Sequence, residues 1–538
     1  MTGKTSEARE RVEVRTAPDL INPFQLNAME PADSAFIEDL GVGRLLDQMP
    51  FSAPASRTVA LQMLVELQCD PATLEFRQQL LTDLLESQAL RASLHQLLGS
   101  LLVINRQSNE FGWGSDLPTG LSLLRNYCQL LREPPDFSRA KSAGLQQLGE
   151  FLSTLERSPL YADIELFLEQ MSNLGGLQLR VTVDDKGVPA EISTFKLLDG
   201  EEVKQPNFLH WGEDESPLHR RQALRDPGGL NHLGQQLQNF LSREFVAVIY
   251  RFNQAIADLA GLLDAVDVYW AMASCFENWR QRGIEICLPE ILPMERREAT
   301  IIAARNPLIE SGGRGDQEAA EIVANDLTRS AEQNLLLITG ANNGGKTTYI
   351  KTAGLIQLLG QKGLYVPARQ ASLSEVDGIF SHFVATDDIG RGEGRYRNEL
   401  RRMRTILERA TPYSLVILDE PCGGTDHREG QRQSLILLKG FHLLGAATFF
   451  TTHMHEMASA MSADQWPGVR QLQAVTAVDD DSGELHYLYQ IAPGIAQRSY
   501  GEQIAATLGL GETEVLRVIR EQAAERGYDQ LLRGQSTR

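Results

Sequence analysis

Apolar residues recur at intervals of three and four along two long stretches of the chain, residues 39–174 and 232–281, as in LLTDLLESQALRASLHQLLGSLLVI. This spacing places the apolar side chains on one face of a helix, which is then buried against another element. Segments that carry proline or glycine, at residues 110–120 and 132–137, interrupt the first stretch. The pattern predicts several helices that pack together as a bundle.

The residues between the two helical stretches follow a different period. Residues 177–198 alternate apolar and polar side chains around the turn sequence DKG, which is typical of two strands joined by a tight turn. The acidic stretch that follows, up to residue 230, shows neither period. We therefore expect a β-hairpin followed by irregular structure, together residues 177–230, inserted into the helical region.

From about residue 285 the pattern changes to short, continuous apolar runs, such as LLLIT (335–339), SLVIL (414–418) and AATFF (446–450). Such runs are typical of parallel strands that are buried on both faces of a sheet and separated by helices. This part of the chain is therefore predicted to be an α/β domain.

The length of 538 residues exceeds what one hydrophobic core usually serves. The expected fold class is multidomain, with α and α/β parts. We expect a mobile N-terminal arm at residues 1–38, a helical domain at residues 39–284, and an α/β domain with a C-terminal helical tail at residues 285–538.

The first apolar run leads into GANNGGKTT, in which Gly340, Gly345, Lys346 and Thr347 fit the spacing G-x-x-x-x-G-K-T. A glycine loop between a buried strand and a helix turns its N–H groups toward a phosphate at the helix N-terminus. Lys346 is predicted to reach the β- and γ-phosphates, and the hydroxyl of Thr347 to ligate Mg²⁺. The alternative is a glycine-rich turn without a ligand; the strand–loop–helix context favours the P-loop.

The second run ends in two adjacent carboxylates, Asp419 and Glu420. Beside a P-loop, Asp419 is predicted to bind Mg²⁺ through water, and Glu420 to orient or deprotonate the attacking water. The alternative is an edge strand that runs into a solvated acidic turn.

The third run continues into Thr451-Thr452-His453. An imidazole at this strand end can sense the γ-phosphate by hydrogen bonding. Taken alone, such a histidine would more often be partly buried and satisfied by a backbone carbonyl, but its place at the end of the next sheet strand favours a functional role. Glu420, Lys346 and His453 are the predicted catalytic residues.

A basic segment, DDIGRGEGRYRNELRRMR, lies between the P-loop and the acidic strand and contains six arginines and three glycines. It fits either a solvated basic helix face or a glycine-led helix that meets a phosphate on a partner subunit. Its position favours the second interpretation, because ABC-type ATPases clamp nucleotide between two protomers in this order.

Charge and cysteine content narrow the possible partners and compartment. The formal net charge is −20, which disfavours strong non-specific binding of nucleic acid over the whole surface. The five cysteines include no C-x-x-C pair and are expected to be reduced thiols. We find no secretory leader and no apolar run of membrane-spanning length, so a cytoplasmic location is expected.

With these motifs in place, the chain resembles the MutS family of DNA mismatch-repair ATPases. The resemblance rests on VANDL (323–327), the P-loop, YVPA (365–368), the strands that end at Glu420 and His453, and SYG (499–501). It extends over residues 305–510 and, more weakly, over the helices at 52–102 and 245–277. It implies a helical core and lever domain, an ABC-type ATPase domain with a P-loop, ATP and Mg²⁺ as cofactors, and a homodimer.

The resemblance also implies a nucleotide site and a segment that acts on the partner subunit. The residues implied to bind nucleotide are Val323, Asn325, Gly340, Asn342, Asn343, Gly344, Gly345, Lys346, Thr347, Thr348 and Tyr489, with Tyr489 stacking on adenine. The trans-acting segment corresponds to Gly394, Arg395, Tyr396 and Glu399. Gly394 stands where the family has a serine, and Arg395 or the Gly394 amide is expected to substitute for it.

The family's N-terminal mismatch-recognition domain, which wedges the phenylalanine of an F-x-E motif into the duplex, has no counterpart in the fewer than fifty residues before the helical region. FIE (36–38) and FLE (167–169) are interpreted as chance matches. We therefore expect a shortened member, an ATP-gated dimeric clamp that acts on branched or recombination DNA rather than on mismatches.

A second hypothesis is an ATP-gated clamp on a protein or ribonucleoprotein partner, without direct contact to duplex DNA. The acidic charge and the small hairpin favour this alternative. A small-molecule kinase is disfavoured, because such kinases lack the trans-acting segment and the His453 strand.

Overall fold

The computed structural model divides into two compact units, each formed by segments that are distant in sequence. Residues Met1–Pro23 and Glu86–Trp270 form one unit, and Phe24–Leu85 and Ala271–Arg538 form the other. The described residues are 17–21, 34–66, 70–111, 117–172, 174–183, 189–199, 249, 252, 256–309, 322–383, 395–423, 426–459, 461, 466–478, 485–496 and 509–526.

The first unit is helical, as the apolar periodicity predicts. Its described helices are α5 (Gln88–Glu110), α6 (Leu117–Arg132), α7 (Ala143–Glu156) and α8 (Pro159–Ser172). Helix α5 begins where the Ser87 hydroxyl accepts a hydrogen bond from the Leu90 N–H, a usual N-cap arrangement. Its leucines at three- and four-residue intervals, from Leu90 to Leu101, are buried. The predicted helical packing is confirmed here.

The predicted β-hairpin is also confirmed. Strands β1 (Leu174–Val183) and β2 (Pro189–Asp199) pair antiparallel. The expected irregular stretch, apart from Asp199, lies outside the described residues.

The second unit combines N-terminal helices with the α/β part. The helices are α1 (Ala35–Asp39), α2 (Val42–Asp47), α3 (Pro54–Val65) and α4 (Pro71–Glu86), and α11 (Leu263–Gln281) continues from one unit into the other. Three contacts tie these helices to residues beyond 285. Arg44 donates to the Leu308 carbonyl at 2.8 Å, Thr82 Oγ1 lies 3.3 Å from the Tyr365 hydroxyl, and Ser381 donates to Asp39 at 2.6 Å.

The units therefore do not follow the predicted boundary at residue 284. Periodicity shows which face of a helix is apolar but not which neighbour covers it. The predicted mobile arm, residues 1–38, also differs in two places. Leu20 is buried and its carbonyl accepts a hydrogen bond from Tyr269, and Phe36 is buried within α1.

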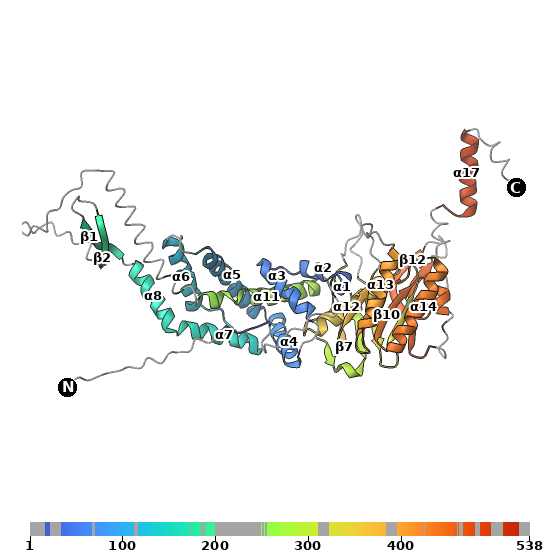
Figure 1. Ribbon diagram of the computed structural model, residues 1–538, viewed down its shortest axis with the longest axis horizontal. Helices are drawn as coiled ribbons and strands as arrows, with labels where there is room; N and C mark the ends of the chain where they lie inside the picture. Colours follow the sequence, from blue (N-terminus) through green and yellow to red (C-terminus); the bar gives the residue numbers. More distant parts are fainter. Residues whose placement is uncertain are drawn as a thin grey trace, which may run out of the picture. The chain divides into compact units, whose positions relative to one another are not determined.

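A six-stranded sheet forms the centre of the α/β part (Figure 1). Its strands, in spatial order, are β12 (Leu485–Pro493), β11 (Val469–Val478), β6 (Leu335–Thr339), β10 (Ala447–Thr452), β9 (Leu415–Asp419) and β8 (Ile379–His382). All neighbouring strands are parallel except β11 and β12. Every residue of β6, β9 and β10 is buried, which explains their continuous apolar runs.

Helices cover both faces of this sheet. Helices α13 (Arg395–Arg409) and α14 (His427–Leu444) share a core cluster with Leu337, Val416 and Leu418. Ile417, which points to the opposite face because side chains alternate along a strand, approaches Gly354 of α12 (Lys346–Gly360). The sheet is thus the middle layer of three.

A smaller mixed sheet lies in the same unit, with strand order β3-β7-β4-β5. Its strands are β3 (Glu290–Leu292), β7 (Gln370–Ser374), β4 (Ala299–Ala304) and β5 (Asn325–Arg329). The remaining described helices are the 3₁₀ turn η2 (Met294–Arg296), α15 (His455–Ser459) and α17 (Glu512–Arg526).

One described helical stretch, Ile256–Gln281, is long and apolar enough to cross a membrane by length and composition. In the structure 72% of its apolar window is buried inside the protein, and the core helices of soluble proteins pass the same test. This stretch is therefore weak support for a membrane span. The cysteines among the described residues, Cys128, Cys275, Cys287 and Cys422, are free.

Candidate active site

Three neighbouring strands bring the predicted chemistry to one edge of the large sheet. Strands β6, β10 and β9 are adjacent and parallel, so their carboxyl ends meet at the same edge, where α/β proteins bind ligands. The glycine-rich loop (residues 340–347) follows β6, Glu420 follows β9 and His453 follows β10. Motifs far apart in sequence therefore converge.

The glycine-rich loop needs glycine at two positions. Gly340 has a φ of 142° and Gly345 a φ of 93°, backbone angles that residues other than glycine rarely adopt. A Cβ on Gly340 would also lie 2.8 Å from the Cβ of Ala474 on β11. Gly345 is the N-cap of α12, so the loop ends where the helix N–H groups begin.

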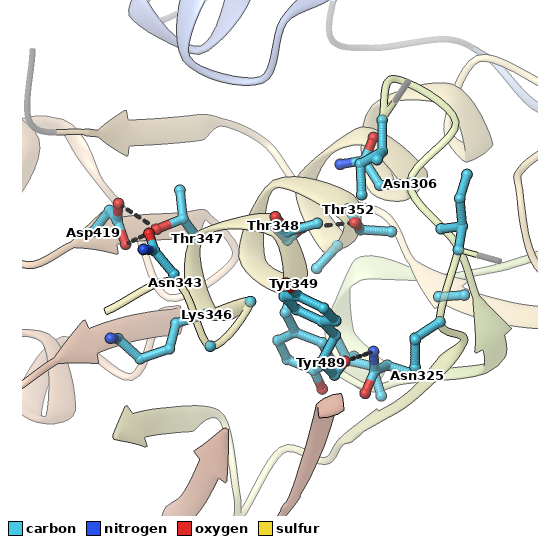
Figure 2. Close-up of a pocket in the computed structure, with 18 of the residues that line it drawn as sticks. Asn306, Asn325, Asn343, Lys346, Thr347, Thr348, Tyr349, Thr352, Asp419 and Tyr489 are labelled. Carbon is cyan, nitrogen blue, oxygen red and sulfur yellow. Dashed lines mark hydrogen bonds between the residues drawn. The ribbon is translucent and has the colours of Figure 1, made fainter. Parts of the chain in front are cut away.

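Lys346 points back into the loop that precedes it (Figure 2). Its side chain is only 4% exposed, and its Nζ donates to the carbonyls of Gly340 at 2.8 Å and Ala341 at 3.0 Å. The same ammonium lies 3.3 Å from Oε1 of Glu420. The cation is thus held between the loop and the carboxylate at the end of β9.

Thr347 and Asp419 form an oxygen-rich pair beside this lysine. The Thr347 hydroxyl lies 2.9 Å and 3.1 Å from the two oxygens of Asp419, and Thr451 donates to Asp419 at 2.6 Å. Burial raises the pKa of Asp419, and the hydrogen bonds from Thr451 and Thr347 oppose that rise. Hydroxyl and carboxylate oxygens are ligands that Mg²⁺ prefers, so the donor set fits the predicted metal.

Glu420 and His453 form the third part of the site. Nδ1 of His453 lies 3.2 Å from Oε2 of Glu420. This hydrogen bond lowers the pKa of Glu420 and raises the pKa of His453. The partner of His453 is therefore a carboxylate, and not the backbone carbonyl of the alternative interpretation.

Of these groups, Lys346, Thr347, Asp419 and Glu420 line a cavity of about 710 Å³. All predicted nucleotide-binding residues except Gly340 line it, together with Asp419 and Glu420. Its lining also includes Ile301, Ala304, Asn306, Ile309, Ile322, Leu327, Tyr349, Thr352 and Ala353, which sequence analysis missed. Many of these come from β4, β5 and the segments beside them, and no local motif marks them because only the packing of the small sheet brings them to the cavity.

Asn325 and Tyr489 are linked at the cavity wall. Asn325 donates to the Tyr489 carbonyl at 2.9 Å (Figure 2) and also accepts from the Ile491 N–H at 2.7 Å. Tyr489 has a φ of 55°, is 50% exposed, and lies against Gly345. Through these two hydrogen bonds, Asn325 holds β12 beside the glycine-rich loop.

The predicted trans-acting segment is described from Arg395 onward. Gly394 lies outside the described residues, and Arg395 begins α13. Tyr396 packs against the core cluster under α13. Glu399 is buried and accepts a hydrogen bond from the Cys422 N–H at 2.7 Å within its own chain. The Glu399 carboxylate therefore points toward the interior of its own subunit.

Comparison with known proteins agrees with this geometry. Residues 336–525 match the family model described as MutS domain V. The chain is 38% identical over 215 residues to the DNA mismatch repair protein MutS of Solibacter usitatus, an alignment that covers 40% of this chain and 24% of that protein. It is 29% identical over 392 residues to the DNA mismatch repair protein MutS of Thermus aquaticus, covering 72% of this chain and 44% of that protein.

The chain thus spans less than half the length of these curated relatives. The matched region contains the glycine-rich loop, the carboxylates after β9, His453 and Tyr489. On these grounds residues 336–525 belong to the MutS domain V family, and this part of the chain is similar to DNA mismatch repair MutS proteins.

Proposed function

We propose that this protein is an ATPase whose ATP-dependent changes of conformation control binding to DNA. The observation that carries the proposal is the convergence of Lys346, the Thr347 and Asp419 pair, and Glu420 on one cavity, with His453 hydrogen-bonded to Glu420. A glycine-rich turn without a ligand would need neither a buried lysine nor two adjacent carboxylates.

The backbone amides of residues 342–347 would bind the phosphates at the N-terminus of α12, where the helix dipole favours anions. Lys346 would place its ammonium on the β- and γ-phosphate oxygens in exchange for its present contacts. Thr347 and Asp419 would hold Mg²⁺, which when bound neutralises charge that develops on the transferred phosphoryl group.

Glu420 would orient the attacking water. Its lowered pKa keeps the carboxylate ionised at neutral pH, so it can accept a hydrogen bond from water in line with the γ-phosphate. His453, hydrogen-bonded to Glu420, would report the state of that phosphate to the end of β10. Val323, Asn342, Thr348 and Tyr489 line the cavity that would hold the rest of the nucleotide.

The assembly that we propose is a homodimeric clamp that closes with ATP and loosens after hydrolysis, acting on branched or recombination DNA rather than on mismatches. Support for a DNA partner comes from the relatives, which are DNA mismatch repair proteins, and support for a clamp comes from the helical unit that accompanies the ATPase part. The net charge of −20 favours a second candidate, a clamp on a protein or ribonucleoprotein partner.

The decisive experiment uses Glu420→Gln, which is expected to keep nucleotide binding, lose hydrolysis and accumulate as the closed dimer. Its binding to matched duplex, mismatched duplex, four-way junction and single strand is measured with ATP and Mg²⁺ at physiological salt. ATP-dependent preference for the junction would support the DNA clamp. Dimer formation without binding to any of these DNAs would support the second candidate. Persisting ATP hydrolysis in the variant would show that Glu420 does not orient the attacking water.

A further inference from the structure

The backbone that carries Glu420 is strained. Glu420 has a φ of 47° and Cys422 a φ of 66°, with Pro421 between them. Left-handed conformations of residues other than glycine cost free energy and persist only where the surrounding structure holds them. The groups that hold this tripeptide therefore also determine where the Glu420 carboxylate lies.

Three side chains hold the tripeptide, one at each residue. The Thr451 hydroxyl accepts from the Glu420 N–H at 3.0 Å, and the Ser434 hydroxyl donates to the Pro421 carbonyl at 3.1 Å. Glu399 Oε1 accepts from the Cys422 N–H at 2.7 Å, the shortest of these three bonds. All three side chains are buried.

Glu399 differs from the other two because it can carry a charge. Its side chain is 6% exposed, its Oε1 also lies 3.2 Å from Nε2 of His382, and its Oε2 has no hydrogen-bond partner among the described residues. Burying a carboxylate is costly, whereas its hydrogen bond to a backbone amide is stronger than that of a neutral acceptor. This carboxylate joins α13, the end of β8 and the loop after β9.

We propose that Glu399 is a positioning residue for ATP hydrolysis, which acts within its own subunit by fixing the Cys422 amide and thereby the Glu420 carboxylate. The proposal rests on the proposed ATPase function. Glu399 is not among the residues that line the cavity, so it is expected to affect the hydrolysis step and not nucleotide affinity. A displacement of about 1 Å in a catalytic group is enough to slow a reaction substantially.

The test compares Glu399→Ala, Glu399→Gln and, as a matched control on the same helix, Glu408→Ala, whose carboxylate is 57% exposed. Glu399→Ala is expected to lower kcat by about 10- to 100-fold, with the Kd of a non-hydrolysable ATP analogue unchanged within about twofold. Glu399→Gln keeps an acceptor oxygen but loses the charge of the carboxylate, so it is expected to lower kcat by a smaller factor, about 2- to 5-fold. It also provides the measurement if the alanine variant does not fold, as judged by circular dichroism.

A second measurement separates positioning from general destabilisation. Because Glu399 acts through Glu420, Glu399→Ala is expected to slow the residual single-turnover rate of Glu420→Gln by less than about twofold. An unchanged kcat in Glu399→Ala, equal losses of kcat and nucleotide affinity, or the same loss of rate in both backgrounds would overturn the proposal while leaving the ATPase function intact. A wild-type protein that binds the analogue but hydrolyses no ATP would overturn both.

Discussion

At the scale of single residues, the contacts of the Lys346 ammonium support its predicted role in binding phosphate. Its ammonium is buried and surrounded by two carbonyls and the Glu420 carboxylate, so it is already oriented toward the space at the N-terminus of α12. Little conformational entropy remains to be lost on binding a phosphate.

Lys346→Ala is therefore expected to weaken ATP binding by roughly 10- to 100-fold, the loss typical of a hydrogen bond to a charged group. Titration with a fluorescent ATP analogue measures the change. Lys439→Ala, an exposed lysine of α14 outside the cavity lining, is the control and should bind as the wild type does. Equal affinities of the two variants would contradict the assignment of Lys346.

The Glu420 and His453 pair predicts a pH dependence of stability. Their hydrogen bond raises the pKa of His453 above its ordinary value of 6.5 and lowers that of Glu420 below 4.5. The histidine contribution is fully present below pH 6.5 and is lost as the pH rises through the raised pKa. The glutamate contribution is present above pH 4.5 and is lost as the pH falls through the lowered pKa.

The Tm advantage of the wild type over His453→Gln is thus expected to be largest between pH 4.5 and pH 6.5 and to shrink at higher pH. His453 is 42% exposed, so solvent limits the effect to a few degrees at most, roughly as for other exposed ion pairs. Thermal melts of both proteins across this range measure it. A difference that does not vary with pH would show that the pair contributes no proton-linked stability.

At the scale of elements, the segment that comprises β6, the glycine-rich loop and α12 depends on close packing against β11. Gly340 allows this approach because it has no Cβ and because its φ lies in a region that side chains disfavour. The motif spacing therefore reflects the shape of the neighbouring strand as well as the phosphate chemistry.

Gly340→Ala is expected to destabilise the fold by about 1–3 kcal/mol and to impair nucleotide binding, since its Cβ would meet that of Ala474. The control is Gly99→Ala in α5, where an added Cβ meets nothing within 4 Å. That change is expected to stabilise the protein by about 0.5–1 kcal/mol. Urea unfolding measures both changes, and similar midpoints for the two variants would be inconsistent with this packing.

At the scale of the whole molecule, the N-terminal helices belong to the same compact unit as the six-stranded sheet. Leu40, just after α1, is buried against Gly354 of α12, and Asp39 accepts a hydrogen bond from Ser381 at the end of β8. Residues more than 300 positions apart thus share one core. An α/β part that began at residue 285 would lack the N-terminal helices that cover α12.

A fragment of residues 285–538 is accordingly expected to expose apolar surface on α12 and to bind a hydrophobic dye, in contrast to the intact chain. Dye fluorescence and the Tm of fragment and full-length protein provide the measurement. The exposed surface should also make the fragment more sensitive to protease. A fragment with the same Tm as the full chain and no dye binding would show that the N-terminal helices contribute little.

The sequence by itself determined the local chemistry of this protein. The spacing of Gly340, Gly345 and Lys346, the carboxylates after one buried run and the histidine after another each identify a strand end, because parallel strands require continuous apolar runs. Packing around the sheet decided the rest. It brought Asn306 and Tyr349 to the cavity, joined α1–α4 to the unit that contains the six-stranded sheet, and turned Glu399 inward to Cys422. Apolar periodicity in the sequence indicates which face of a helix or strand is buried. Which element packs against that face is determined only by the tertiary fold.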